Sequence, residues 1–157
     1  MPDAADGLDR HERAILDALQ TNARLSVQEL SEKIGLSSSP TWRRIKALEE
    51  RGVIADYIAL LDADKLGFKQ CVFAHVTLAK HDRTGVEQFE QTIAGRDEVL
   101  ECFSMTGEAD YLLRVIVRET KDYEAFLKDV IFTCPAVQHV RSNFALRQIK
   151  FTVRVPI

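Results

Sequence analysis

The apolar positions in the first fifty residues recur at helical spacing, in short runs separated by polar links. Those of the first two runs are Leu8, Ile15, Leu16, Leu19, Val27, Leu30 and Ile34. Each run begins with a pair in the register of a capping box, Asp9 with Glu12 and Ser26 with Glu29, in which a side chain and a backbone amide satisfy each other. Gly35 stands where the second helix would stop, because glycine takes the left-handed cap conformation at little cost. The pattern predicts two capped helices.

A third helix is expected to begin within the segment LSSSPTW, residues 36–42. Ser37 or Ser39 suits its N-cap. Pro40 suits its first turn, where the missing N–H would be unpaired anyway. Gly52 follows as the closing residue. Three short helices, with a tight turn between the second and the third, indicate a helix-turn-helix module.

The outward face of this third helix is narrow and basic. With Ile45 and Leu48 facing inward, the residues that point away at about 100° per residue are Ser39, Arg43, Ala47 and Glu50. Arg43 suits a guanine edge because its guanidinium presents a fork of two donors, and the serines and free amides at the helix start suit a phosphate. The residues expected to contact DNA are Ser37, Ser38, Ser39, Pro40, Thr41, Arg43, Arg44, Lys46 and Arg51. The alternative is a solvated surface helix with ordinary charges.

The lone tryptophan and the segment after the third helix follow no single period. Trp42 is expected to pack its ring against the module, with contact to DNA sugars as the alternative. Short strands are suggested by Val53, Ile54, Tyr57 and Ile58. We assign residues 1–53 to a DNA-binding domain, residues 54–69 to a wing or linker and residues 70–157 to a second domain.

From residue 70 onward the pattern alternates between strands and helices. Strands are expected at residues 71–79, 98–107 and 110–118, helices at 82–95 and 121–134, and one or two final strands within 137–155. This β-α-β-β-α-β order is the split βαβ, or ferredoxin-like, pattern. The whole chain is therefore expected to be an α+β protein: an N-terminal winged helix-turn-helix followed by an antiparallel sheet with two helices on one face.

The other face of that sheet needs a cover. This face is not expected to be exposed to water, because the strands carry apolar residues such as Phe73, Val76, Phe103 and Leu113. Pairing with the sheet of a second chain is the simplest solution, because large exposed apolar patches usually mark such contacts.

Composition adds limits to this picture. The 157 residues carry a net charge of −3, and residues 1–60 hold 8 basic and 10 acidic side chains. DNA affinity must therefore come from a small patch, in several copies. The polar N-terminus and the lack of a run of roughly 20 apolar residues favour a cytoplasmic protein without a membrane partner. The three cysteines form no CxxC pair and are expected to be buried free thiols, with no metal site.

Catalysis finds little support in the sequence. No His-Asp-Ser or Cys-His grouping stands at a telling spacing, and neither a phosphate loop nor an HExxH motif occurs. We therefore expect no enzyme and no cofactor. An amino-acid-binding enzyme and a binding module without DNA affinity are the rival hypotheses, since a fold does not fix function.

The chain resembles the Lrp/AsnC family of feast/famine transcription regulators from about Leu8 to Ile157. The resemblance rests on LDRHERAILDALQTNARLSVQELSEKIGLSSSPTWRRIKALEERGVI in the first half and on VLECFSMTGEADYLLRV in the second. It is closest to members beside amino-acid catabolism genes, through TWRR and the tail NFALRQIKFTVRVPI. It implies an N-terminal module that binds double-stranded DNA and a C-terminal module that dimerises through its sheet. Such dimers often assemble further, into octamers or open helices.

The resemblance also implies a small effector, often an amino acid, bound between subunits near a GxxD turn. Here that turn runs from Gly107 to Asp110. Gly107 permits close backbone approach, and Asp110 is a candidate partner for an ammonium. Taken without the family, the same residues fit a plain β-turn. The residues expected at the effector are Met105, Thr106, Gly107, Asp110, Tyr111, Ser142 and Asn143, the last two from another subunit and with at most one of them facing the pocket.

Overall fold

The computed structural model describes residues 7–79 and 83–157, and the chain forms two compact units. The first comprises Met1–Leu60 together with Lys150–Ile157, and the second comprises Leu61–Ile149. Each unit has a hydrophobic cluster of its own. The expected domain of residues 70–157 thus differs from the structure in its tail, because residues 150–157 group with the first unit.

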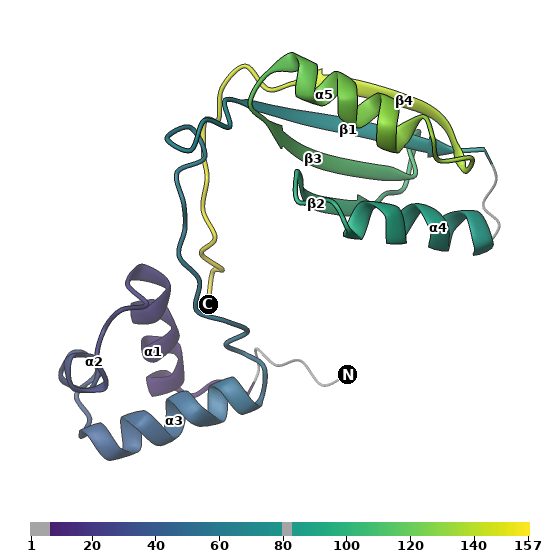
Figure 1. Ribbon diagram of the computed structural model, residues 1–157. Coiled ribbons are helices and arrows are strands. Elements are labelled where there is room, and N and C mark those ends of the chain that lie inside the picture. The colour runs from purple at the N-terminus through teal and green to yellow at the C-terminus, as the bar shows by residue number, and fades with distance from the viewer. Residues whose placement is uncertain (1–6, 80–82) are drawn as a thin grey trace. The chain divides into compact units, whose positions relative to one another are not determined.

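The first unit is built from three helices (Figure 1): α1 (Arg10–Thr21), α2 (Val27–Ile34) and α3 (Ser38–Glu50). Both expected capping boxes are present, at Asp9 and Ser26, and Gly35 ends α2 with φ +70°. The core of this unit is formed by Ile15, Leu16, Leu30, Ile45 and Leu48. Apolar spacing and local capping therefore predicted the three helices of the first unit correctly.

The start of α3 follows one of the two expectations, because Ser37 rather than Ser39 is the N-cap residue. The short strands expected from Val53 to Ile58 are absent from the described residues. The reason lies in hydrogen bonding at the end of α3. The N–H groups of Val53 and Ile54 donate to the carbonyl of Leu48, at 2.9 and 3.2 Å, which removes these donors from any strand pairing.

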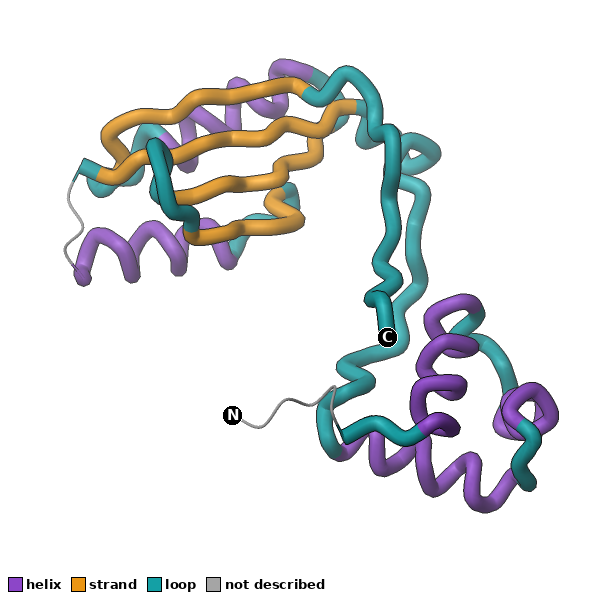
Figure 2. Tube along the Cα trace, turned by 180° about the vertical axis from the view of Figure 1, so that it is seen from behind, coloured by secondary structure: helices purple, strands orange, loops and turns teal. Residues whose placement is uncertain are grey.

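The second unit has the expected β-α-β-β-α-β order. Its elements are β1 (Gln70–Leu78), α4 (Arg83–Ala94), β2 (Val99–Ser104), β3 (Tyr111–Val117), α5 (Thr120–Phe126), the π-helical turn η1 (Leu127–Ile131) and β4 (Val137–Phe144). The sheet is antiparallel, in the order β2-β3-β1-β4. Both helices lie on one face, and Figure 2 shows the sheet from its other side. The expected helix start at residue 82 lies outside the described residues.

Side chains alternate between the two faces of the sheet, as strand geometry requires. The face covered by helices carries Val72, Ala74, Val76, Leu113 and Val115, all fully buried. Val76 and Leu113 were expected on the uncovered face, and that expectation was wrong. The uncovered face, which we call the open face, carries Phe73, Phe103, Leu112, Arg114 and Ile116, as the strand register shows.

Cysteine burial differs from the expectation at one position. Cys134 is buried and Cys71 is half-buried, but Cys102 is exposed on β2. Strand β2 lies at the edge of the sheet, where it has a neighbouring strand on one side only. Partial burial raises the pKa of the Cys71 thiol. The pKa of the Cys102 thiol is also raised, because neighbouring protein atoms displace part of the water around its sulfur even though the residue as a whole is exposed.

Candidate DNA-binding surface and effector loop

The basic side chains of α3 and its end differ in whether they have a partner. Arg44 pairs with Asp9, Lys46 Nζ lies 2.6 Å from Glu49, and Arg51 Nη1 lies 2.9 Å from Glu12. Arg43 is exposed and forms no ion pair within residues 7–79 and 83–157. Because Arg43 has no ion pair among these residues, none has to be broken when its guanidinium binds the edge of a base. The structure therefore favours Arg43 among the expected DNA contacts.

Arg44 and Arg51 fasten α3 to the start of α1. Their partners, Asp9 and Glu12, are the two members of the capping box of α1. The backbone N–H of Glu12 and the guanidinium of Arg44 hold the pKa of the Asp9 carboxyl below its usual value. One local cap is thus also a tertiary clamp that orients the basic helix.

The N-terminal end of α3 holds the remaining expected contacts. Ser37, Ser38 and Ser39 are exposed, and Pro40 is half-buried. Thr41 is fully buried, and its hydroxyl donates to the carbonyl of Ser37 at 3.0 Å. Thr41 therefore supports the helix start from inside, and the expected contact between its side chain and DNA does not fit.

Trp42 departs from the preferred expectation. Its side chain is 52% exposed, so the ring is not packed into the three-helix core. The ring occupies the flank of α3, next to Arg43 in sequence. The alternative reading, in which Trp42 lies against DNA sugars, is therefore the one that its exposure favours.

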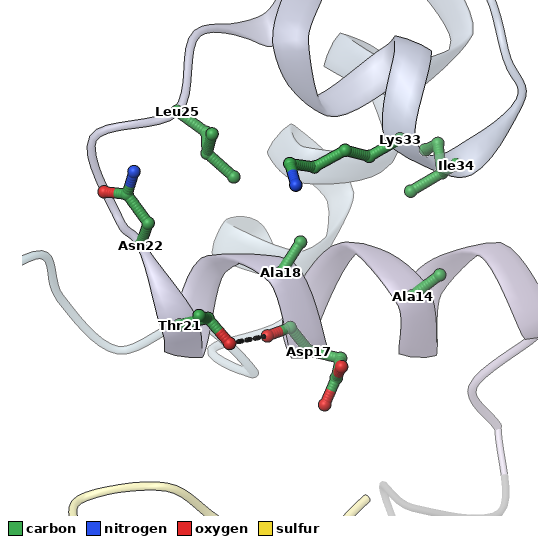
Figure 3. A pocket seen from close by; sticks show the side chains of 8 residues that line it. All are labelled: Ala14, Asp17, Ala18, Thr21, Asn22, Leu25, Lys33 and Ile34. Atoms are coloured by element: carbon green, nitrogen blue, oxygen red, sulfur yellow. Dashed lines mark hydrogen bonds between the residues drawn. The ribbon is translucent and has the colours of Figure 1, made fainter.

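A hollow of about 470 Å³ lies between α1 and α2 (Figure 3). Ala14, Ala18, Leu25 and Ile34 give it apolar walls, and the Lys33 side chain extends across it. None of the residues expected to contact DNA lines this hollow. The basic surface of α3 and this hollow are separate features of the first unit.

In the second unit, the loop of residues 105–110 connects β2 to β3. Gly107 has φ +120°, a conformation that side chains strongly disfavour, so this position needs glycine. The N–H groups of Gly107 and Glu108 donate to no acceptor among the described residues. Successive amides of this kind can receive an anion. The glycine of the expected turn thus has the geometry that the sequence suggested.

Asp110 has a structural role that the sequence did not reveal. Its Oδ2 accepts the N–H of Leu78 at 2.7 Å, and its own N–H donates to the carbonyl of Val76 at 2.9 Å. The β1–β4 register shifts between Thr77 and Leu78, and Asp110 satisfies the backbone at this irregularity. Asp110 therefore fixes the loop to the end of β1.

Two charged residues beside the loop were missed by sequence reasoning. Glu108 Oε2 lies 3.6 Å from Arg141 Nη1, and the carbonyl of Glu108 accepts the Thr77 hydroxyl at 3.4 Å. Arg141 belongs to β4 and is opposite His75 of β1, on the open face. The signal available in the sequence was the alternation of β4, in which Arg141 and Asn143 share one face.

The remaining expected effector residues separate onto the two faces of the sheet. The hydroxyls of Ser142 and Tyr123 lie 2.6 Å apart, so Ser142 faces α5. Asn143 lies opposite Phe73 on the open face. The Tyr111 hydroxyl donates to Glu90 at 2.7 Å, and burial with this bond raises the pKa of Tyr111 to about 12. The side chains of Ser142 and Tyr111 therefore belong to the helix-covered layer.

The exposed part of the loop completes the set. Met105 and Thr106 are exposed, and the N–H of Met105 donates to the carbonyl of Asp110 at 2.8 Å, which closes the loop.

Within residues 7–79 and 83–157, no group of three or more His, Cys, Asp or Glu side chains is placed to hold a metal ion. In the same ranges, no helix has the length and apolar character needed to cross a membrane.

Comparison with known proteins matches both units. The model of the Lrp/AsnC ligand binding domain matches residues 71–155, and that of a winged helix-turn-helix DNA-binding domain matches residues 8–55. The Bkd operon transcriptional regulator of Pseudomonas aeruginosa is 40% identical over 150 residues, covering 96% of this chain and 98% of the relative. The DNA-binding transcriptional activator DecR of Escherichia coli K12 is 37% identical, covering 96% and 99%.

Solved structures show the same likeness over the full length. An AsnC family transcriptional regulator from Agrobacterium tumefaciens has a TM-score of 0.90 at 41% identity, covering 95% of this chain and 97% of the other. A transcriptional regulator from Neisseria meningitidis in complex with L-Met has a TM-score of 0.91 at 36% identity, covering 95% and 96%. The first unit therefore matches proteins that bind DNA, and the second matches a domain that binds ligands.

Proposed function

The chain belongs to the Lrp/AsnC family of transcription regulators, and from this premise we propose that a small amino acid, bound at the loop of residues 105–110 beside a second subunit, modulates its sequence-specific DNA binding. The DNA is read by α3, with Arg43 as the base-contacting residue. The observation that carries the proposal is the pairing of two features. Arg43 on the reading helix has no ion-pair partner among the described residues, and in a separate unit the loop of residues 105–110 has two backbone amides without an acceptor in the same part of the chain.

The chemistry of the loop suits an α-amino acid, which carries both a carboxylate and an ammonium. The amides of Gly107 and Glu108, which have no acceptor among the described residues, can donate to the carboxylate. Glu108 and Arg141, which lie 3.6 Å apart, supply one charge of each sign. Asp110 holds the loop in place through Leu78. The L-Met bound to the regulator from Neisseria meningitidis supports this ligand class.

A gel shift on the DNA upstream of the protein's own gene tests the proposal. We expect a specific complex whose midpoint concentration changes with one or more amino acids, because a ligand that prefers one assembly state shifts the equilibrium toward it. A thermal-shift screen selects the amino acids to use, since binding to the folded form raises the melting temperature. A specific shift that no amino acid alters would contradict the effector, and the absence of any specific shift would contradict the DNA-binding role.

A regulator of this kind works where the DNA is, so we place it in the cytoplasm.

The open face supplies the surface for a dimer. Phe103 is 50% exposed on this face, where it lies opposite Leu112 of β3, and the same face carries Phe73 of β1 and Ile116 of β3. The first unit carries as many acidic as basic side chains, ten of each, so a single copy of the α3 surface holds DNA weakly. We propose that two sheets pair through their open faces and bring two copies of α3 to one DNA site; the family resemblance implies that such dimers assemble further.

Sedimentation at micromolar concentration checks this assembly. We expect at least a dimer for the wild type, and we expect Phe103→Glu to release monomers because it buries a charge between two apolar sheets. Phe132→Glu is the matched control, since Phe132 is 66% exposed after η1 and does not belong to the sheet. A monomeric wild type, or equal loss of assembly in both variants, would place the contact elsewhere.

A further inference from the structure

The C-terminal tail, residues 150–157, returns to the N-terminal unit. Figures 1 and 2 both show the tail running beside the segment that follows α3. The chain therefore passes between the two units twice, first between residues 60 and 61 and again between residues 149 and 150. The first passage follows the expected linker, and the second leads into the tail, which contacts α1 of the first unit.

Polar contacts attach the tail to α1. The side-chain amide of Gln20 forms two hydrogen bonds with the backbone of Val155: its Nε2 donates to the carbonyl at 3.1 Å, and its Oε1 accepts the N–H at 2.5 Å. Gln20 thus satisfies both backbone groups of Val155, as a paired β-strand would. One turn earlier on α1, Asp17 pairs with Arg154. The two α1 side chains are three positions apart and meet adjacent tail residues.

Apolar contacts accompany the polar ones. Val155 and Ile157 line a hollow of about 390 Å³ whose other walls include Leu16 and Leu19 of α1 and Val53 after α3. Neither hydrophobic core cluster contains a tail residue. The tail is therefore an addition to the first unit, and the three-helix core is complete without it.

We propose that the docked tail is a second tether that orients the DNA-reading unit, with Gln20 as its positioning residue. A unit held by one flexible segment can turn freely, whereas a unit held by two segments has fewer orientations. In a dimer, this restriction raises the effective concentration of the second reading helix at the adjacent half-site. The inference rests on the proposed function, because it assumes a dimer that reads two half-sites.

The attachment is weak enough to be released. Asp17 and Arg154 have side chains that are about half exposed, and an exposed ion pair contributes little stability because water screens it. The Gln20 amide adds two ordinary hydrogen bonds. A change of state in the second unit can therefore detach the tail without unfolding either core, and so alter the spacing of the reading helices.

Gln20→Ala in the full-length chain tests the tether. The Val155 amide should exchange with deuterium at least about tenfold faster, because it loses its acceptor. Affinity for a DNA fragment with two half-sites should fall about tenfold, and affinity for a single half-site should stay within about twofold, since only the second binding event depends on orientation. Deletion of residues 150–157 should reproduce both DNA results. Gln28→Ala is the control, because Gln28 lies on α2 and pairs with Glu32.

Each other outcome counts against the tether. Faster exchange with unchanged affinity for both fragments would show a docked tail without an orienting role. An equal loss on both fragments, with a lower melting temperature, would show that Gln20 merely stabilises the first unit. If the wild type bound neither fragment, the proposed function would fail, and the tether with it. A loss of the same size in Gln28→Ala would remove Gln20 from any special role.

Discussion

Arg43→Ala is expected to weaken specific DNA binding by about 1–3 kcal/mol per site, or on the order of ten- to a hundredfold. The physical reason is that Arg43 is the basic residue of α3 whose guanidinium has no ion-pair partner among the described residues. Its fork of donors is therefore available to a guanine edge. A titration against the cognate site and against a site with a changed base should show lower affinity and lower discrimination together.

Two further variants separate reading from general charge. Arg43→Lys keeps a positive charge but loses the fork, so we expect it to retain salt-dependent binding and to lose base discrimination. Lys46→Ala removes the same charge from the same helix, but Lys46 already lies 2.6 Å from Glu49, so its loss should be small. Equal losses in Arg43→Ala and Lys46→Ala would mean that net charge, and not base contact, explains the effect.

Asp110→Ala is expected to remove the amino-acid response while ligand-free DNA binding stays close to that of the wild type. The Asp110 carboxylate accepts the Leu78 N–H at 2.7 Å, and without it the loop of residues 105–110 loses its attachment to β1. The site and the reading helix lie in different units, so DNA contacts are not touched directly. Calorimetry with the best amino acid from the thermal-shift screen should show at least a tenfold loss of affinity, the size expected when a hydrogen bond to a charged group is removed.

Asp110→Asn decides how the carboxylate acts. The asparagine oxygen can accept the Leu78 N–H, but the side chain carries no charge for an ammonium. We expect this variant to bind the amino acid within roughly threefold of the wild type, because a neutral acceptor replaces a charged one at little cost. A loss as large as that of Asp110→Ala would show instead that the charge reaches the ligand. Wild-type affinity in both variants would place the ligand elsewhere. If Asp110→Ala failed to fold, Asp110 would have only a structural role in its turn.

The sequence predicted the arrangement around the loop of residues 105–110 only in part, and the differences share a cause. The special backbone conformation expected of Gly107 is confirmed, because it depends on the backbone of this one residue; its contact with an effector stays a prediction. Ser142 and Tyr111 were placed beside the effector, yet their side chains bond to Tyr123 and Glu90 on the helix side of the sheet. Glu108 and Arg141, which flank the loop, were not predicted. Strand alternation says which residues share a face, but it does not say which face the helices cover.

The sequence by itself determined what depends on residues three or four positions apart. Capping boxes at Asp9 and Ser26 and the left-handed Gly35 fixed the first two helices, because these interactions close within one helical turn. Strand and helix periods in the same way determined the β-α-β-β-α-β order of the second unit.

Only the tertiary structure decided which side chains are available for function. Arg44 meets Asp9 across 35 positions, Arg51 meets Glu12 across 39, and Gln20 meets Val155 across 135. No local pattern encodes such pairs, because each depends on how whole elements pack. These contacts occupy Arg44 and Arg51, while Arg43 has no ion-pair partner among the described residues, and they bring the tail back to α1. The Asp110 carboxylate in the same way accepts the N–H of Leu78, 32 positions away, since a charge or amide near a packed surface bonds to the partner that the fold places within reach.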